Sequence, residues 1–137
     1  MIDSNFSAVY QRLFVFPVAR FCRLSANSIT ILSLITGLIA AVCIAVGQPV
    51  WAVVLLLLSG YLDSLDGVVA RHFDSSSDQG CVLDIFCDRA VEFAVMFGLL
   101  MVAPAERALE AFLMLGASYL CITSFLVVAI FSKKIGL

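Results

Sequence analysis

Four aspartates stand within two long apolar runs of this chain, and they limit its fold more than any other feature. Asp63 and Asp66 lie near the end of one run, and Asp84 and Asp88 lie in the next. On insertion scales, an aspartate at the centre of a membrane costs about 2.5–3.5 kcal/mol, so each one needs compensation. Residues three or four positions apart share one face of a helix. Two facing helices would therefore bring all four carboxylates to one cleft.

Ion pairs alone cannot balance such a cluster, because residues 63–92 include seven acidic residues but only two arginines. Hard divalent cations such as Mg²⁺ and Mn²⁺ take carboxylate and phosphate oxygens as ligands, which favours a two-metal site at the cluster. Gly67, Ala70 and Gly80 leave little side-chain bulk beside it. Arg71 follows the first two of these residues, where it could contact a phosphate.

Composition indicates an integral membrane protein. Of the 137 residues, 63% are apolar and 13% are charged, and the mean hydropathy is +1.11. Soluble domains average about 45–50% apolar and 25% charged residues. No basic block suggests a nucleic acid partner. The cysteines show neither metal-ligand spacing nor a disulfide framework; they are Cys22, Cys43, Cys81, Cys87 and Cys121.

The apolar runs predict an all-α bundle of about four transmembrane helices, since about 20 residues span a bilayer. The expected spans are 28–46, 50–71, 80–103 and 111–131. A tight turn at 47–49 separates the first two, and the short polar linker 72–79 joins the second and third as antiparallel neighbours. Glu106, Arg107 and Glu110 predict an amphiphilic turn before the fourth span. Arg89 and Glu92 are expected to pair with each other or with a neighbouring carboxylate.

Residues 1–24 have apolar side chains at helical spacing and predict an amphipathic helix that lies in the membrane surface. A short helix packed against the bundle is the alternative. Basic residues precede the first span, border the linker and follow the fourth span, so by parity they share one side. The positive-inside rule then predicts that the N-terminus, the aspartates and the C-terminus are cytoplasmic. In a bacterium this membrane would be the inner, or plasma, membrane.

The residues around the aspartates resemble the signature of the CDP-alcohol phosphotransferases, the CDP-alcohol phosphatidyltransferase family of membrane enzymes in phospholipid biosynthesis. That signature reads Asp-x-x-Asp-Gly-x-x-Ala-Arg, eight residues, then Gly-x-x-x-Asp-x-x-x-Asp. Every position matches, with Asp63, Asp66, Gly67, Ala70, Arg71, Gly80, Asp84 and Asp88. The resemblance implies transfer of a substituted phosphate from a CDP-linked donor, expected to be CDP-diacylglycerol, to an alcohol hydroxyl with release of CMP.

The resemblance also suggests roles for individual residues. It implies that Asp63, Asp66 and Asp84 hold Mg²⁺ or Mn²⁺. Asp88 would share a metal and act as the base that takes the proton of the acceptor hydroxyl. Contact with the nucleotide and its diphosphate would come from Asp66, Gly67, Ala70, Arg71 and Gly80, together with Asn27 and Thr30. Asn27 and Thr30 resemble a family motif in which Ala26 replaces a proline, although a helix N-cap role explains Asn27 as well.

Residues 25–137 are thus expected to form a transmembrane domain like that of the resembled family. Members usually have six membrane helices, so the chain is expected to be either a fragment that lacks two helices or an unusually short form. The expected partners are the donor, a small alcohol acceptor, the bilayer and, as an option, a second copy of the chain. Glycerol 3-phosphate, inositol phosphate, serine and an amino alcohol all remain candidates for the acceptor.

Two other classes of protein remain as alternatives. In a transporter or channel, intramembrane carboxylates would bind a cation or relay protons. This class explains acidic residues in membrane helices but not the glycines, Ala70 and Arg71 at their positions. A structural bundle with self-paired charges is the other alternative, and the excess of acidic residues opposes it.

Overall fold

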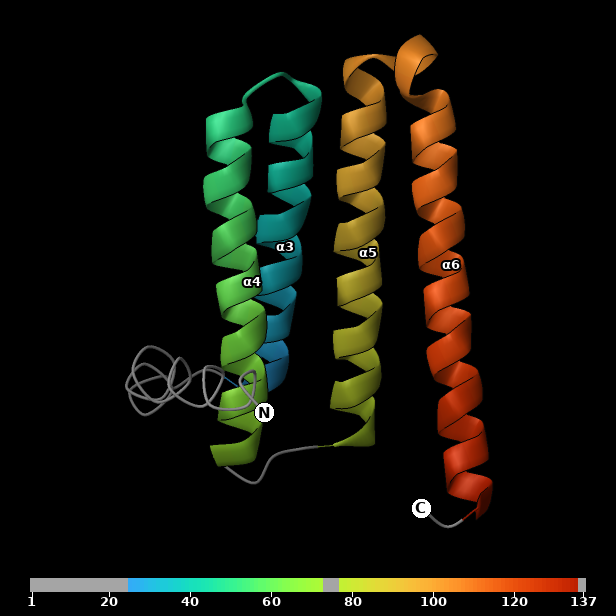
Figure 1. Ribbon diagram of the computed structural model, residues 1–137. Helices are drawn as coiled ribbons and strands as arrows, with labels where there is room; N and C mark the ends of the chain where they lie inside the picture. Colours follow the sequence, from blue (N-terminus) through green and yellow to red (C-terminus); the bar gives the residue numbers. More distant parts are fainter. Residues whose placement is uncertain (1–24, 73–76, 136–137) are drawn as a thin grey trace, which may run out of the picture.

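The computed structural model describes residues 25–72 and 77–135, and these form four helices. The helices are α3 (Ala26–Ala45), α4 (Pro49–His72), α5 (Asp78–Val102) and α6 (Pro104–Ile135). They lie alongside one another, and the chain reverses direction from each helix to the next (Figure 1). This arrangement confirms the predicted all-α bundle. The predicted surface helix at 1–24 lies outside the described residues.

Three of the described helices are long and apolar enough to cross a membrane. The candidate spans are Ala26–Ala45, Pro49–Ala70 and Pro104–Ala129. α5 has 25 residues and is also long enough, but it carries Asp84, Asp88, Arg89 and Glu92 along its length. It packs mainly against α3, with fewer contacts to α6. Of these four residues, Asp84 and Glu92 are partly buried, whereas Asp88 and Arg89 are exposed.

Serine residues define the start of two helices. Ser25 precedes α3, and its Oγ accepts a hydrogen bond of 3.3 Å from the backbone N–H of Ser28. Ser77 precedes α5 in the same way, with its Oγ 3.0 Å from the backbone nitrogen of Gly80. A serine at this position satisfies one of the backbone donors that a helix N-terminus leaves unpaired. Ser25, and not Asn27, is therefore the N-cap of the first described helix.

α6 begins earlier than the sequence predicted. The expected turn around Glu106 and Arg107 is absent, because both residues lie in the first turn of a helix that starts at Pro104. Proline is favoured at the first helical position, and an acidic residue in the first turn interacts well with the helix dipole. Arg107 also reaches back to α5, where its Nη1 donates a hydrogen bond of 3.2 Å to the carbonyl oxygen of Leu99. Glu106 and Arg107 therefore belong to the first turn of α6 and not to a separate turn before it.

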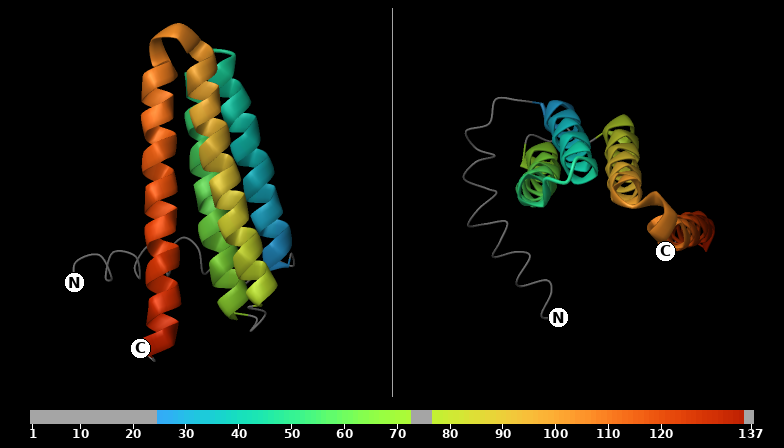
Figure 2. Two further views of the ribbon diagram at one scale, coloured as in Figure 1. Left: turned by 90° about the vertical axis from the view of Figure 1, so that its right-hand side faces the viewer. Right: turned by 90° about the horizontal axis from the view of Figure 1, so that it is seen from above.

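Small residues allow α3 to pack closely between α4 and α5. Viewed along the bundle, α3 lies beside both of these helices, and α6 lies beyond α5 (Figure 2). Ala40 and Ala41 of α3 are buried. A Cβ atom at Gly98 of α5 would be only 2.6 Å from the carbonyl oxygen of Ala41. Such close backbone contact is typical of helix packing in membranes, where small residues line the interfaces.

A reciprocal pair of serines joins α3 to α4. The Oγ atom of Ser33 donates to the carbonyl oxygen of Ser59, and the Oγ atom of Ser59 donates to the carbonyl oxygen of Ser33, both at 2.9 Å. Both serines are buried. Hydrogen bonds of this kind between membrane helices contribute about 0.6 kcal/mol on average. The pair therefore fixes the register of the two helices more than it adds stability.

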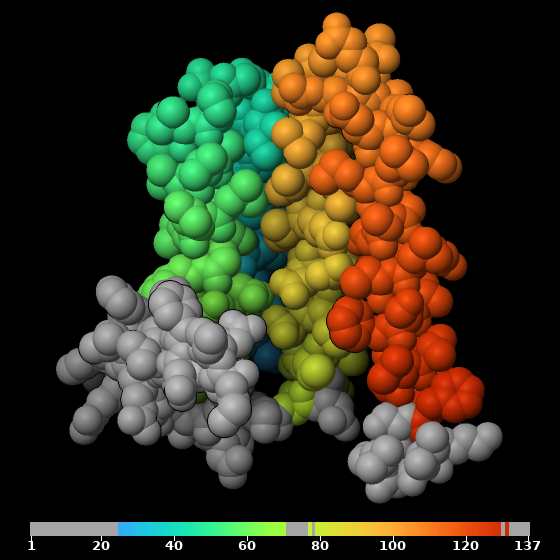
Figure 3. Space-filling model, in the orientation of Figure 1, coloured from blue at the N-terminus to red at the C-terminus, as the bar shows by residue number. Residues whose placement is uncertain are grey.

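The outer surface of the bundle is apolar. The exposed large side chains include Trp51 and Leu57 of α4 and Phe112 and Phe125 of α6. Such a surface suits contact with lipid tails, which need no hydrogen bonds from the protein. In the space-filling view, α3 is visible behind a hollow between α4 and α5 (Figure 3). Thr30, Ser33, Ser59 and Asp66 are buried between the helices.

Candidate metal and nucleotide site

Three of the four motif aspartates form a compact cluster. Asp63 and Asp66 are on α4 and Asp84 is on α5, and each offers a carboxylate oxygen that lies within 4.8 Å of the other two. Asp66 is only 5% exposed. The antiparallel course of α4 and α5 brings the C-terminal end of one helix beside the N-terminal end of the other (Figure 1). The structure thus brings together the two halves of the motif as the helical spacing predicted.

Asp88 lies at the edge of this cluster, next to the carboxylate of Asp63. It is one turn further along α5 than Asp84, and it is exposed. Its carboxylate is close enough to that of Asp63 for the two to repel each other. Both aspartates line a cavity of about 460 Å³ that extends between the helices. The four carboxylates are thus neighbours, although only those of Asp63, Asp66 and Asp84 are grouped within 4.8 Å of one another. Three converge, and the fourth faces the adjacent cavity.

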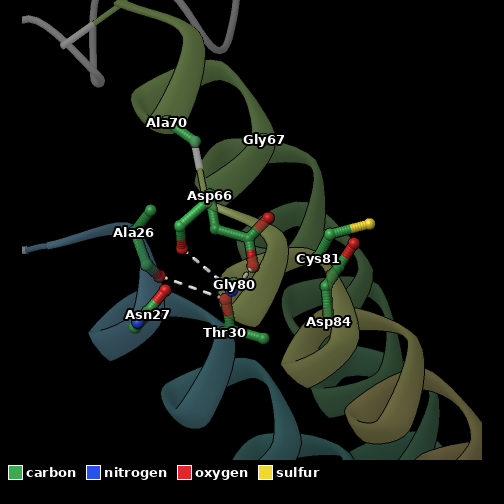
Figure 4. A pocket seen from close by; sticks show the side chains of 10 residues that line it. Ala26, Asn27, Thr30, Asp66, Gly67, Ala70, Gly80, Cys81 and Asp84 are labelled. Atoms are coloured by element: carbon green, nitrogen blue, oxygen red, sulfur yellow. Dashed lines mark hydrogen bonds between the residues drawn. The ribbon is translucent and has the colours of Figure 1, made fainter. Parts of the chain in front are cut away.

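A second cavity, of about 190 Å³, lies on the other side of the cluster, and Asp66 and Asp84 line it. Its walls come from the start of α3, the end of α4 and the start of α5 (Figure 4). Most of the predicted nucleotide residues gather here. The lining residues are Ala26, Asn27, Thr30, Asp66, Gly67, Ala70, Ser77, Gly80, Cys81 and Asp84. The side chain of Arg71 lies outside the described part of the chain, so its predicted phosphate contact remains a prediction.

Two side-chain oxygens approach the backbone of Gly80 closely. A Cβ atom there would be 3.2 Å from Oδ1 of Asn27 and 3.2 Å from Oγ of Ser77. That separation is tighter than an ordinary van der Waals contact. The absence of a side chain at Gly80 therefore leaves room for the Asn27 amide at the wall of the pocket (Figure 4). This position supports the interpretation of Asn27 as a pocket residue over its interpretation as an N-cap.

Thr30 connects the pocket to the carboxylate cluster. Its hydroxyl donates a hydrogen bond to Oδ2 of Asp66 across the interface between α3 and α4 (Figure 4). The same hydroxyl lies 3.1 Å from the carbonyl oxygen of Ala26, one turn back on its own helix. Thr30 is 4% exposed. The sequence predicted a nucleotide contact for this residue, and the structure adds a direct link to a carboxylate.

The charged residues that follow Asp88 pair with each other, as one of the two predicted alternatives proposed. Arg89 donates to Glu92 within α5. The second carboxylate oxygen of Glu92 accepts a hydrogen bond of 2.7 Å from Oγ of Ser118 on α6. The sequence analysis did not single out Ser118. A hydroxyl in an apolar helix is a weak signal, because its partner depends on which helices are neighbours.

The fold and the site together define a class of protein: an integral membrane bundle with an acidic cluster and a small pocket at one end of its helices. The family is then clear from comparison with known proteins. The family model for CDP-alcohol phosphatidyltransferase matches residues 23–136, so the chain belongs to this family of transferases. The family resemblance drawn from the motif is therefore confirmed.

Curated relatives agree with this assignment. The chain is 33% identical to the inner membrane protein YnjF of Escherichia coli over 103 residues, which cover 71% of the chain and 50% of the relative. It is 40% identical to the CDP-diacylglycerol–inositol 3-phosphatidyltransferase of Candida albicans over 63 residues, or 46% of the chain and 27% of the relative. It is 34% identical to the phosphatidylinositol phosphate synthase of Corynebacterium glutamicum over 91 residues, which cover 64% of the chain and 41% of the relative. The chain thus spans half the length of these relatives or less.

Proposed function

We propose that the protein transfers a phosphatidyl group from a CDP-linked lipid, CDP-diacylglycerol, to the hydroxyl of a small alcohol and releases CMP. The observation that carries this proposal is the convergence of Asp63, Asp66 and Asp84 beside a pocket that is lined by the other motif residues. Membership in the family supports it. Two relatives are named for phosphatidylinositol-type products. The reaction would place the protein in phospholipid biosynthesis.

The carboxylate cluster fits a divalent cation. Mg²⁺ binds oxygen ligands at about 2.0–2.1 Å, so two ligands on opposite sides of the ion lie about 4.2 Å apart. The oxygens of Asp63, Asp66 and Asp84 lie within 4.8 Å of one another, so these three residues would hold the ion together. Mg²⁺ or Mn²⁺ held there, with a second ion shared by Asp88, would polarise the diphosphate of the donor and offset charge on the leaving CMP.

The pocket at the end of the bundle would hold the nucleotide portion of the donor. Gly67, Ala70 and Gly80 keep its walls free of bulky side chains. The Asn27 side chain at its rim offers an amide donor and an amide acceptor to polar groups of the ligand. Arg71, at the end of α4, would contact a phosphate. In this arrangement the diphosphate lies next to the carboxylates and the nucleoside extends away from the membrane interior.

Asp88 would serve as the general base. A base must reach the reacting hydroxyl directly or through one water molecule. Asp88 lines the larger cavity together with Asp63, so an acceptor there would lie beside the cluster. Asp88 would take the proton of the acceptor hydroxyl as its oxygen bonds to the lipid-linked phosphorus. The bond from that phosphorus to the bridging oxygen breaks, and CMP leaves with the electron pair.

The direct test is a transfer assay with the purified full-length protein, radiolabelled CDP-diacylglycerol and a panel of acceptors. Glycerol 3-phosphate, inositol phosphate, serine and an amino alcohol form the panel, and each reaction is run with Mg²⁺, with Mn²⁺ and after chelation. We expect CMP and one labelled phospholipid to form only when donor, acceptor and divalent cation are all present. Undiminished CMP release after thorough chelation would contradict the cation requirement. Ion transport without any CDP-lipid would favour a transporter.

A further inference from the structure

We propose that Thr30 is a positioning residue, whose hydroxyl holds the Asp66 carboxylate in the orientation that joins Asp63 and Asp84 in the cluster. This inference rests on the proposed function, in which the three carboxylates hold a divalent cation. Thr30 belongs to α3, whereas the carboxylates belong to α4 and α5. The hydrogen bond from Thr30 to Asp66 therefore ties a third helix to the cation site (Figure 4).

Burial makes this hydrogen bond important for Asp66. Thr30 is 4% exposed and Asp66 is 5% exposed, so water has little access to either side chain. A buried carboxylate that lacks a hydrogen-bond donor is costly, and its side chain would rotate toward any other donor. With the Thr30 hydroxyl on Oδ2, one side of the Asp66 carboxylate is satisfied by the protein. The backbone N–H of Gly67 also donates to this carboxylate, and because a carboxylate accepts at about four lone-pair sites, others remain for a cation.

The Thr30 hydroxyl has only one proton, which limits the number of hydrogen bonds that it donates. Two acceptors already compete for it, the Asp66 carboxylate and the carbonyl oxygen of Ala26 at 3.1 Å. Phosphate oxygens of a nucleotide are also acceptors, so they would have to displace one of these two. The influence of Thr30 on the donor therefore passes through Asp66.

The serine pair provides a rigid frame for this contact. Ser33 lies one turn after Thr30 on α3, and Ser59 lies two turns before Asp66 on α4. The reciprocal hydrogen bonds between the two serines, both 2.9 Å, fix α3 against α4. The Thr30 hydroxyl is thus presented to Asp66 by the packing of two helices. The frame also supplies a control, because Ser33 joins the same two helices without contact to Asp66.

The test compares three variants by Mn²⁺ titration of the purified full-length protein, with free Mn²⁺ measured by electron paramagnetic resonance. Thr30→Val keeps the shape of the side chain but removes the hydroxyl, Thr30→Ser keeps the hydroxyl, and Ser33→Ala removes a hydroxyl from the frame. Loss of a residue that orients a metal ligand typically weakens metal binding about 10–100-fold. We expect this loss in Thr30→Val, near wild-type affinity in Thr30→Ser, and near wild-type affinity but a lower melting temperature in Ser33→Ala.

Each of the following three outcomes would contradict the inference. If Thr30→Val binds Mn²⁺ as tightly as the wild type, the inference is wrong while the cation site stands. If Thr30→Val and Ser33→Ala weaken Mn²⁺ binding equally, Thr30 acts only through packing and the inference is also wrong. If the wild type itself binds no Mn²⁺, the cation site of the proposed function fails, and the inference fails with it. A supporting result would also appear in catalysis, as a higher Mg²⁺ requirement in Thr30→Val than in Thr30→Ser.

Discussion

The position of each aspartate suggests a division of roles among side chains of the same type. Asp63, Asp66 and Asp84 converge within 4.8 Å, whereas Asp88 is exposed and faces the larger cavity. A cation ligand needs several oxygens around one point, and a base needs access to a hydroxyl that arrives from outside. The first condition describes the cluster of three, and the second describes Asp88.

Replacing Asp88 by asparagine should separate these roles. Asparagine keeps one oxygen and nearly the same shape but cannot accept the acceptor proton. Loss of general-base catalysis typically costs about 10²–10⁴-fold in rate, so we expect turnover of Asp88→Asn to fall by that factor while CMP binding remains. The measurement is steady-state transfer together with calorimetric titration of CMP. Near-normal turnover would refute the assignment of Asp88 as base and leave the cation site intact.

Variants of the cluster itself should lose affinity and gain stability. Asp63→Ala and Asp84→Ala each remove a cation ligand, so Mn²⁺ and donor binding should weaken, and extra Mg²⁺ should restore part of the activity. Each change also removes one of several carboxylates that repel one another. Without divalent cation, we therefore expect a melting temperature above that of the wild type. A lower melting temperature in chelator would indicate that the aspartates belong to a structural ion-pair network.

At the level of the helices, glycine positions divide into those that packing requires and those that it does not. A Cβ atom at Gly98 would be 2.6 Å from the Ala41 carbonyl oxygen, whereas a Cβ atom at Gly116 of α6 would meet no atom within 4 Å. A side chain at position 98 would therefore push α3 and α5 apart. A methyl group at position 116 would fit without any change in the structure.

Gly98→Ala should therefore destabilise the bundle, and Gly116→Ala should not. Overpacking of a tight interface typically costs about 1–3 kcal/mol, which should appear as a lower melting temperature of the protein in detergent. Gly116→Ala serves as the matched control, since alanine is a better helix former than glycine. Equal melting temperatures for the two variants would mean that α3 and α5 are not in close contact in the folded protein.

Some features of the helices follow from local sequence pattern, and others depend on which helices pack together. Spacings of three and four placed Asp63, Asp66 and Asp84 on facing surfaces, because the period of a helix is a local property. The start of α6 at Pro104 was missed, since charged residues near a helix N-terminus resemble a polar turn. The contact between Glu92 and Ser118 also escaped prediction, because it depends on which helices pack together.

At the level of the whole molecule, the site and the α3–α4 turn lie at opposite ends of the bundle. The start of α3, the end of α4 and the start of α5 form the pocket, whereas Gln48 lies in the turn at the other end (Figure 1). A bundle that spans the membrane must expose these two ends on opposite sides. In the sequence, Arg12, Arg20 and Arg23 precede the first span, and Lys133 and Lys134 follow the fourth, so the positive-inside rule predicts that the site end is cytoplasmic.

This orientation is open to a direct test by cysteine labelling. Gln48 and Gln79 are both exposed, and they lie at opposite ends of the helices. With the native cysteines replaced, Gln48→Cys should react with a membrane-impermeant thiol reagent on spheroplasts of a bacterial host. Gln79→Cys should react only after the membrane is permeabilised, because Gln79 lies at the start of α5 beside the pocket and the CDP-linked donor is expected in the cytoplasm. Retained transferase activity of each variant provides the control for folding. Labelling of Gln79→Cys on sealed spheroplasts, with Gln48→Cys protected, would reverse the predicted orientation and place the carboxylate cluster at the outer face.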